Sequence, residues 1–436
     1  MNTPFHRSAV VPVRGLHLDL KGLPPTPARL LQLLDLFAAA RINCVLVEWE
    51  DSFPWTIDPR FRSETAYSAA DVEAFHTKAR QLDIDVIPLV QSLGHMETPL
   101  QPADYAHLRE IPDRCDVLNP LAPGAGDLVA RMIDDVLARS GPITHFHLGG
   151  DEAWTFGSHP DTKAYIEKHG KASLYLQHIE PLLDKLLAKN IRPILWHDMM
   201  HDWDAAALSR LAKKADLMFW SYRGHSDDRQ GAFHTSVIER FAAAGVPLWG
   251  ACAYKGADGP DADLPDVAAR VANAQAFADL AQRFHFHGVV ATAWSRYATH
   301  RVQCEPIDGS LDALIKVATS LHDEHAADDA TVEQFLRAHG EWDRFRACRD
   351  ALAKLSDSRR LAWQYELYIR QQTATEAADV RRRGSGMLGE LRRIKQTHVD
   401  TAVASGEKVR AAMSGLVETI WIERYLQERL APLTEE

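Results

Sequence analysis

Short apolar runs recur eight times along the chain, and a longer segment separates each run from the next. The runs are almost continuously apolar, which is typical of parallel strands that are buried on both faces. They span residues 13–20, 44–49, 85–91, 145–149, 193–197, 217–221, 247–253 and 289–295. This pattern predicts eight strands.

The segments between the runs carry helix signals. Thr26 and Pro27 place an N-cap residue before a proline at the first helical position, and Leu30, Leu34 and Phe37 then share one apolar face. Similar apolar stripes lie at 68–82, 127–138, 174–187 and 267–280. Eight strand–helix alternations favour an α/β fold of the closed (β/α)8 TIM-barrel type over an open sheet, because eight parallel strands close into a barrel.

The pattern changes after about residue 326, where no further strand is predicted. Aromatic residues lead into long helical stretches at 352–371 and 387–430, and a basic run at 381–383 is typical of a solvated connection between helices. We predict a catalytic barrel over 1–325 and an α-helical region over 326–436. This region is expected to pack on the barrel or, in a homodimer, on a second subunit.

Composition narrows the possible partners and the cellular address. A formal net charge of -11 disfavours nucleic acid, because an acidic surface repels phosphate groups. Five cysteines without a CxxC pair indicate a reducing compartment rather than a disulfide framework. Residues 1–13 lack the apolar core of a signal peptide, and no run approaches the roughly 20 apolar residues that span a bilayer. We therefore expect a cytoplasmic protein with no membrane partner.

The predicted strand ends are rich in carboxylates and aromatic residues, and this is the end of a (β/α)8 barrel that carries the active site. In chain order they read Asp19-Leu20-Lys21-Gly22, Glu48-Trp49-Glu50-Asp51, Gln91 with Gly94-His95, Gly149-Gly150-Asp151-Glu152, Trp196-His197-Asp198, Trp220-Ser221-Tyr222, Tyr254-Lys255-Gly256 and Trp294-Ser295-Arg296-Tyr297. We expect the side chains of these strand ends to converge on one site.

Asp151 and Glu152 are the candidate catalytic pair. Neighbouring side chains on a regular strand point to opposite faces, so both acids reach a substrate only if the strand ends there. The preceding Gly149 and Gly150 permit such an irregular backbone and leave room for a ligand. This context favours catalysis over an ordinary pair of surface acids.

Four tryptophans from separate strand–helix units are expected at the same face of the barrel. Together they would form an apolar box against which a sugar ring or an acetamido methyl group packs, although any one of them could instead be core. They are Trp154, Trp196, Trp220 and Trp294.

The stretch from His145 to Glu152, His-Phe-His-Leu-Gly-Gly-Asp-Glu, resembles the fourth-strand signature of glycoside hydrolase family 20. Residues 14–19 resemble the arginine motif of the family's first strand, and Gly94-His95 resembles its glycine–histidine motif. Trp196, Trp220 and Trp294 match its pocket tryptophans, and Tyr254 its acetamide-binding tyrosine. Residues 17–22, 48–54 and 88–97 resemble the hexosaminidase D branch, and the resemblance covers roughly residues 14–320.

The resemblance implies an exo-β-N-acetylhexosaminidase that removes terminal, non-reducing GlcNAc or GalNAc from a glycan or glycoconjugate, without a metal or other cofactor. Such enzymes use the substrate's own 2-acetamido oxygen as the nucleophile. Glu152 would be the general acid and then the general base, and Asp151 would orient the 2-acetamido group. By the same resemblance Tyr254 would bind the acetamido carbonyl, Arg14 and Glu305 distal hydroxyls, and His95 would support the site.

Three alternatives stay open from the sequence. A metal-dependent barrel hydrolase is suggested by His145-x-His147 and by His197-Asp198, because alternate histidines on a strand form metal-binding pairs. A barrel that binds amino sugars without catalysis would keep the aromatic box. A retaining glycosidase with an enzyme nucleophile would use the two acids in a different way.

Overall fold

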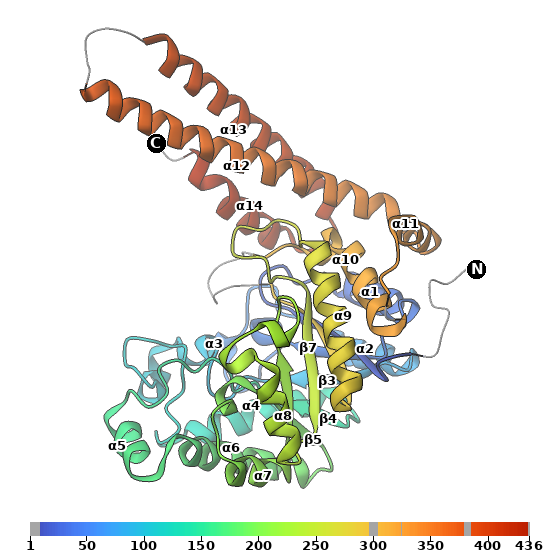
Figure 1. Cartoon of the computed structure of the whole chain (residues 1–436), viewed down its shortest axis with the longest axis vertical. Helices are drawn as coiled ribbons and strands as arrows, with labels where there is room; N and C mark the ends of the chain where they lie inside the picture. Colours follow the sequence, from blue (N-terminus) through green and yellow to red (C-terminus); the bar gives the residue numbers. More distant parts are fainter. Residues whose placement is uncertain (1–8, 296–303, 324, 379–384, 435–436) are drawn as a thin grey trace.

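The computed structural model describes residues 9–295, 304–323, 325–378 and 385–434. Eight parallel strands pair in chain order, and β8 closes the sheet against β1 (Figure 1). The strands are β1 Val13–Asp19, β2 Cys44–Glu48, β3 Asp85–Leu89, β4 His145–His147, β5 Arg192–Trp196, β6 Asp216–Trp220, β7 Leu248–Lys255 and β8 Gly288–Ala293. The predicted (β/α)8 barrel is confirmed.

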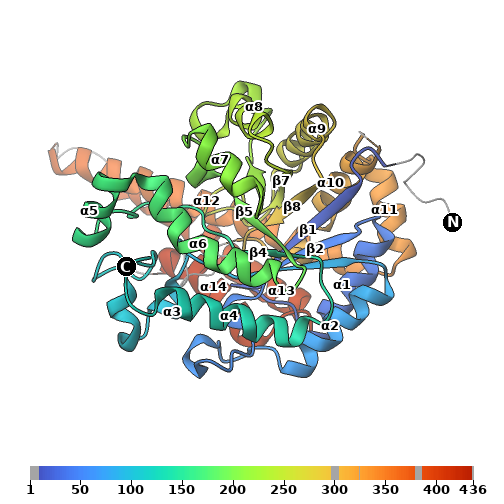
Figure 2. The ribbon, with the colours of Figure 1, turned by 90° about the horizontal axis from the view of Figure 1, so that it is seen from below.

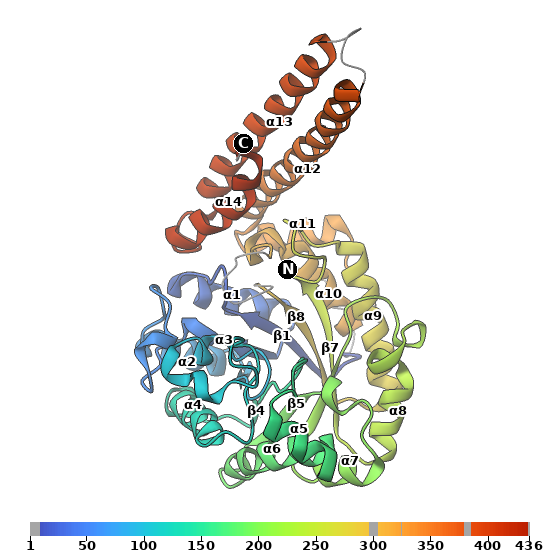
Figure 3. The same cartoon turned by 90° about the vertical axis from the view of Figure 1, so that its left-hand side faces the viewer.

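Helices enclose the strands on the outside, as Figures 2 and 3 show from two directions. Those that follow strands of the barrel are α1 Pro27–Ala39, α2 Ala69–Gln81, α3 Glu97–Leu100, α4 Ala125–Ser140, α5 Pro160–His169, α6 Lys171–Leu187, α7 Ala205–Ala212, α8 Thr235–Ala243, α9 Val267–Phe284, α10 Leu311–Asp323 and α11 Asp329–Ala338. Within the described ranges, no helix is both long and apolar enough to cross a membrane.

Local signals in the sequence set where the helices begin. The Thr26 side chain accepts a hydrogen bond from the Arg29 backbone N–H at the start of α1. Ser68 and Asp71 form a capping box at the start of α2, in which each side chain bonds the other residue's backbone N–H. Such caps satisfy backbone donors that have no partner within the helix.

Alternation along the strands divides the barrel core into two layers. On β2, Cys44 and Leu46 belong to a cluster inside the barrel, whereas Val45 and Val47 belong to the layer under the helices. The inner cluster also holds Trp196, with Trp220 and Trp294 packed against it. The barrel interior is therefore filled with side chains, and the tryptophans lie toward its carboxyl end.

Three further helices form a region that extends away from the barrel: α12 Trp342–Ala378, α13 Ser385–Met413 and α14 Thr419–Thr434 (Figures 1 and 3). The helix expected over 387–430 is wrong as one unit. It is divided at Gly415, whose φ of 76° belongs to the left-handed region that ends helices. The expected boundary at residue 326 falls between α10 and α11, and Val332, Phe335 and Leu336 of α11 still pack in the outer barrel layer.

The C-terminal helices attach to the barrel at loops that follow strands. Asp263, in the loop after β7, accepts hydrogen bonds from Tyr425 (2.6 Å), Arg429 (2.7 Å) and Arg359 (2.7 Å). Asp263 is 1 % exposed, so this cluster is shielded from water. The region therefore borders the same end of the barrel as the active site.

Candidate active site

The end of β4 has an irregular backbone that the sequence makes possible. Gly149 and Gly150 have φ values of 58° and 82°, and β4 stops at His147, two residues before the predicted end. A Cβ atom at Gly149 would lie 1.9 Å from Gln91 Oε1, and one at Gly150 would lie 2.3 Å from the Tyr175 hydroxyl. Both glycines are needed for conformation and for space.

Three residues with side chains hold left-handed backbone in this region: Glu50 (φ 47°), His95 (φ 54°) and Glu152 (φ 45°). The other such residues in the described chain follow helix ends or tight turns between elements, where this conformation is common. Left-handed backbone outside such turns costs free energy and gathers at functional sites. The strained residues thus mark the same barrel end as the strand-end carboxylates.

The predicted acids lie together, with His95 between them. His95 Nε2 is 3.5 Å from Asp151 Oδ2 and 3.4 Å from Glu152 Oε2. Burial opposes a charge on His95, but Asp151 and Glu152 outweigh it and raise the pKa of the imidazole well above its usual value. The Asp151 side chain is 7 % exposed and that of Glu152 is 33 % exposed. One acid is therefore enclosed, and its neighbour reaches solvent.

Asp198, directly after β5, is a third carboxylate of the site. Its Oδ2 accepts a hydrogen bond from the Glu152 backbone N–H (2.9 Å), and its Oδ1 accepts one from Trp220 Nε1 (3.2 Å). Burial, followed by the charge of Asp151, raises the pKa of Asp198 to about 7. Asp198 therefore fixes both the acid-bearing backbone and one wall of the aromatic box.

The aromatic box contains Trp196, Trp220, Trp294 and Tyr222. Trp196 is fully buried and lies 6.2 Å from Trp294 between ring centroids. Tyr222 stacks on Trp220 at 5.1 Å and lies 6.3 Å from Trp294. The structure thus brings three of the four predicted tryptophans together and adds a tyrosine.

A cluster of charges lies at the ends of β1 and β2. Lys21 Nζ contacts Glu48 Oε1 (2.8 Å) and Asp19 Oδ1 (3.2 Å), and it lies 6.0 Å from the Trp294 ring centroid. Burial disfavours the Lys21 charge, but Asp19 and Glu48 outweigh it and raise the pKa of the amine. Gln91 Nε2 donates to the same Glu48 oxygen at 3.2 Å. The cluster places one cation and two carboxylates at the box.

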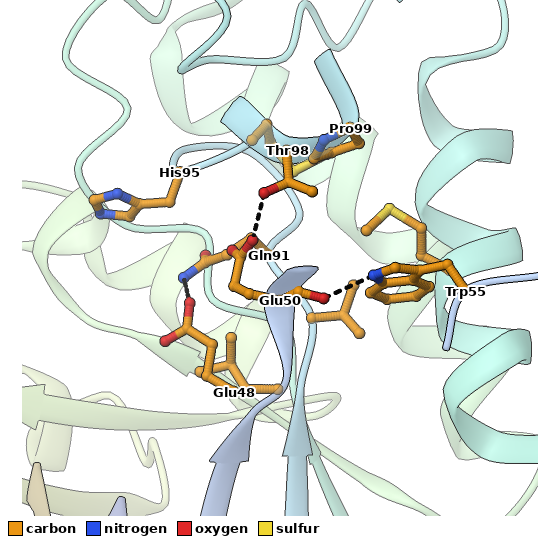
Figure 4. Close-up of a pocket in the computed structure, with 11 residues that line it drawn as sticks. Glu48, Glu50, Trp55, Gln91, His95, Thr98 and Pro99 are labelled. Carbon is orange, nitrogen blue, oxygen red and sulfur yellow. Dashed lines mark hydrogen bonds between the residues drawn. The ribbon is translucent and has the colours of Figure 1, made fainter. Parts of the chain in front are cut away.

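Figure 4 shows a pocket that borders this cluster on the side of His95. Glu50 lies in it, with Oε2 accepting a hydrogen bond from the Thr98 hydroxyl at 2.9 Å. Burial raises the pKa of Glu50 to about 7, and Glu48 contributes to this increase against the opposing charge of Lys21. His95 therefore lines this pocket and also contacts the catalytic candidates Asp151 and Glu152.

Arg14 does not belong to the site. It pairs with Val289 at the start of β1, at the opposite end of the barrel from the acids. Its guanidinium donates to the backbone carbonyls of Val11 (2.8 Å), Pro12 (2.9 Å) and Arg41 (2.9 Å). The expected sugar-binding role is wrong, because Arg14 lies near the start of β1 and its side chain does not reach the opposite end of the barrel, where the acids lie. Lys21 is the cation that lies at that end.

Tyr254 does not lie in the aromatic box either, in contrast to the prediction from the sequence. It belongs to the outer layer with Cys252, whereas Ala251 lies inside the barrel. Burial raises the pKa of its hydroxyl well above the usual value, with Glu305 and Asp308 adding to the effect. Tyr254 sits at an irregularity in the pairing of β7, between Ala253 and Lys255. Tyr254 faces the same way as Cys252, two residues earlier, as alternation along a strand requires, so its side chain points toward the helices and away from the barrel interior.

Tyr222 and Asp198 stood among the strand-end residues expected at the site, but neither of them was assigned a role toward the sugar from the sequence. Burial raises the pKa of the Tyr222 hydroxyl well above the usual value, and the charges of Asp151 and Glu152 act in the same direction. Each residue lies two positions beyond a strand-end tryptophan, Trp220 or Trp196. That shared spacing from a strand-end tryptophan was the available signal in the sequence.

Other predicted residues have different positions. Trp154 is 74 % exposed and does not join the box. Glu305 is buried, and its Oε1 accepts a hydrogen bond from the Gly256 N–H at 2.6 Å, so it fixes the loop after β7. Arg296 and Tyr297, quoted at the end of β8, lie outside the described residues.

The histidines that suggested a metal site have other neighbours. His147 accepts a hydrogen bond from the Gly149 N–H at 3.0 Å and packs on Trp196 at 4.3 Å, and burial lowers its pKa to about 3. The His145 ring packs on Trp249 at 5.4 Å. In the part of the chain that the structure describes, no group of three or more His, Cys, Asp or Glu residues is arranged to hold a metal ion.

A (β/α)8 barrel with adjoining acids and an aromatic box at its carboxyl end is the arrangement of a glycosidase. Residues 12–306 match the model of the catalytic domain of glycosyl hydrolase family 20. The chain belongs to this family, and it is thus a glycoside hydrolase of the β-hexosaminidase type.

Relatives agree with this assignment. Hexosaminidase D of Bos taurus is 32% identical over 337 residues, which are 74% of this chain and 96% of the bovine protein. Hexosaminidase D of Homo sapiens is 31% identical over 326 residues, which are 72% of this chain and 65% of the human protein. A chitobiase structure from Flavobacterium johnsoniae superposes with a TM-score of 0.59 at 15% identity, covering 98% of this chain and 70% of the chitobiase. The structural likeness supports the barrel fold.

Proposed function

We propose that this chain is an exo-β-N-acetylhexosaminidase that removes terminal GlcNAc or GalNAc by substrate-assisted, retaining hydrolysis. The observation that carries the proposal is the setting of Asp151. Its Oδ1 is buried and has no hydrogen-bond partner in the described part of the chain, while its Oδ2 faces His95. Buried polar atoms are normally satisfied, and the N–H of an acetamido group supplies the donor that this oxygen needs.

The two acids then divide the chemistry. Asp151 accepts the acetamido N–H, so that the acetamido carbonyl oxygen is directed at the anomeric carbon and displaces the leaving group. Glu152, which reaches solvent, protonates the departing glycosidic oxygen and later takes a proton from the attacking water. Retention follows, because the anomeric carbon is inverted twice.

Tyr222 takes the place expected for Tyr254. Its hydroxyl lies in the field of Asp151 and Glu152, and its ring lines the box with Trp220 and Trp294. A hydroxyl in this position donates to the acetamido carbonyl oxygen, and the tryptophans exclude water from the cationic intermediate.

The charge cluster at Lys21 is suited to the hydroxyl groups of the terminal sugar. Lys21 supplies donors, and Asp19 and Glu48 supply acceptors, each with a carboxylate oxygen within 3.2 Å of Lys21 Nζ. Trp196 is fully buried in the cluster inside the barrel, so the inner end of the box is backed by the packed core. A site backed in this way supports action at a chain terminus.

The test is a panel of aryl glycosides that differ at the 2-position, with the variants Glu152→Gln and Asp151→Asn. We expect Glu152→Gln to lower kcat on the 2-acetamido substrates by about 10²–10⁴-fold. Asp151→Asn should impair the 2-acetamido substrates selectively, and a thiazoline analogue of the cyclic intermediate should inhibit the wild type. Glu167→Gln, an exposed acid on α5, is the matched control and should keep full activity.

Each alternative predicts a different result. Near-wild-type turnover by Glu152→Gln would refute the acid/base role. Hydrolysis of 2-hydroxy glycosides as fast as 2-acetamido glycosides would favour an enzyme nucleophile, and sugar binding without turnover would indicate a binding protein. Activity abolished by exhaustive chelation and restored by a divalent cation would support the metal-dependent alternative.

A further inference from the structure

Trp154 is the most exposed of the large apolar side chains in the described chain, at 74 %. Its position follows the acid of the proposed mechanism, because the Trp154 N–H donates to the Glu152 carbonyl oxygen at 2.7 Å across a three-residue turn. Two residues of chain span at most about 7 Å, so the Cα atoms of Trp154 and Glu152 lie within this distance of each other, and the indole is long enough to border the approach to the Glu152 carboxyl group. Asp151 and Ala153 are buried, whereas the Glu152 side chain is 33 % exposed and Trp154 is 74 % exposed, so Glu152 and Trp154 are the residues of this segment that reach solvent.

The loop that carries Trp154 is held from both sides. On one side the Tyr175 hydroxyl donates to the Gly150 carbonyl oxygen at 3.0 Å. On the other side Glu110, which is fully buried, accepts hydrogen bonds through Oε1 from the backbone N–H groups of residues 157–159 and from the Thr162 hydroxyl. Phe156, next but one to Trp154, is buried and contacts Tyr175.

An exposed aromatic ring on a fixed backbone is prepared to bind. A single exposed apolar side chain is usually unremarkable, and a mobile loop would account for one. Here the backbone is anchored within four residues on each side, at Gly150 and at Gly157, so Trp154 is presented to solvent from a fixed backbone position. A loop that is already ordered loses little backbone entropy when a ligand covers it.

We propose that Trp154 is the platform for the sugar on the leaving-group side of the scissile bond. This proposal rests on the proposed function. The general acid must lie within hydrogen-bond reach of the glycosidic oxygen, and the leaving sugar is bonded to that oxygen on the side away from the box. The apolar face of a pyranose ring is the chemistry that an exposed indole binds. Trp154 is therefore a specificity residue that selects glycan aglycones over leaving groups without a ring.

The experiment compares two substrates that share the terminal sugar. N,N′-diacetylchitobiose has a pyranose leaving group, whereas the β-fluoride of 2-acetamido-2-deoxyglucose releases fluoride and offers nothing to stack on Trp154. We expect Trp154→Ala to lower kcat/KM on the disaccharide by about 10-fold and to leave the fluoride within two-fold. Trp154→Phe should recover most of the loss. Trp363→Ala, an equally apolar change at a tryptophan on α12 that is 62 % exposed, should affect neither substrate.

The outcomes separate the two proposals. An equal loss on both substrates, or no loss on either, with an unchanged thermal unfolding midpoint overturns the platform role while the proposed function stands. A wild-type enzyme that hydrolyses neither substrate overturns the proposed function, and the platform with it. A lowered unfolding midpoint for Trp154→Ala also contradicts the proposal, because a ring that serves only to bind ligand contributes little to folding.

Discussion

Replacing Gly94 with alanine adds one methyl group at the back of the catalytic pair. The ideal Cβ position at residue 94 is 2.0 Å from the Asp151 carbonyl oxygen and 3.2 Å from the Ala153 nitrogen. The φ of Gly94 is not in the left-handed region, so alanine meets a problem of space and not of backbone conformation. This substitution therefore tests how strongly kcat depends on the position of Asp151.

The size of the effect follows from this contact. Cβ atoms essentially never lie closer than 3.0 Å to such an atom, so either segment must move by at least about 1 Å. The loop before Gly94 resists displacement, because the Ser92 hydroxyl donates to the Leu148 carbonyl oxygen at 2.6 Å and the Ser92 carbonyl oxygen pairs with His178 at 2.8 Å. Part of the movement therefore falls on Asp151. A misplacement of about 1 Å in a catalytic group can cost about 10²-fold in rate.

The assay is kcat and KM on a 2-acetamido aryl glycoside, measured beside the thermal unfolding midpoint. We expect Gly94→Ala to lower kcat by about 10²-fold and to destabilise the fold by about 1–3 kcal/mol, the range for an overpacked site. Gly126→Ala is the matched control, because nothing lies within 4 Å of its added Cβ and the residue is in α4. It should keep full activity and gain up to about 1 kcal/mol from helix propensity. A kcat for Gly94→Ala within three-fold of the wild type would refute this reasoning.

Two further predictions concern the tyrosines and the pH dependence of stability. Tyr222→Phe should lower kcat/KM on 2-acetamido substrates by about ten-fold, the loss of one hydrogen bond in a dry site, whereas Tyr254→Phe should stay within two-fold; the reverse order would restore the assignment made from the sequence. The folded-state pKa of Asp198 is about 7, above its usual value near 4, so folding takes up a proton between these pH values. The stability supplied by this group is complete below about pH 4 and is lost as the pH rises through 7, at up to about 1.4 kcal/mol per pH unit. Chemical unfolding at a series of pH values should show a shallower decline for Asp198→Asn, and an unchanged slope would contradict the raised pKa.

The sequence was sufficient for the fold because its signals are local and repeated. Eight apolar runs of strand length, each followed by a helical segment and several of these opened by a capping residue, leave few arrangements that bury every strand on both faces. The same applies to Asp151 and Glu152, because Gly149 and Gly150 before them carry the conformational requirement in their residue type. These features depend on neighbours in the chain, and a single sequence contains them.

The tertiary structure alone decided which of the other strand-end residues face the substrate. Arg14 and Lys21 stand at opposite ends of one strand and its following loop, and only the closed barrel shows which end carries the acids. The closed barrel also shows that Tyr254 shares the outer layer with Cys252, whereas Tyr222, after β6, contributes to the box. Side-chain direction in a barrel depends on register between strands distant in sequence, which residue spacing within one strand cannot specify.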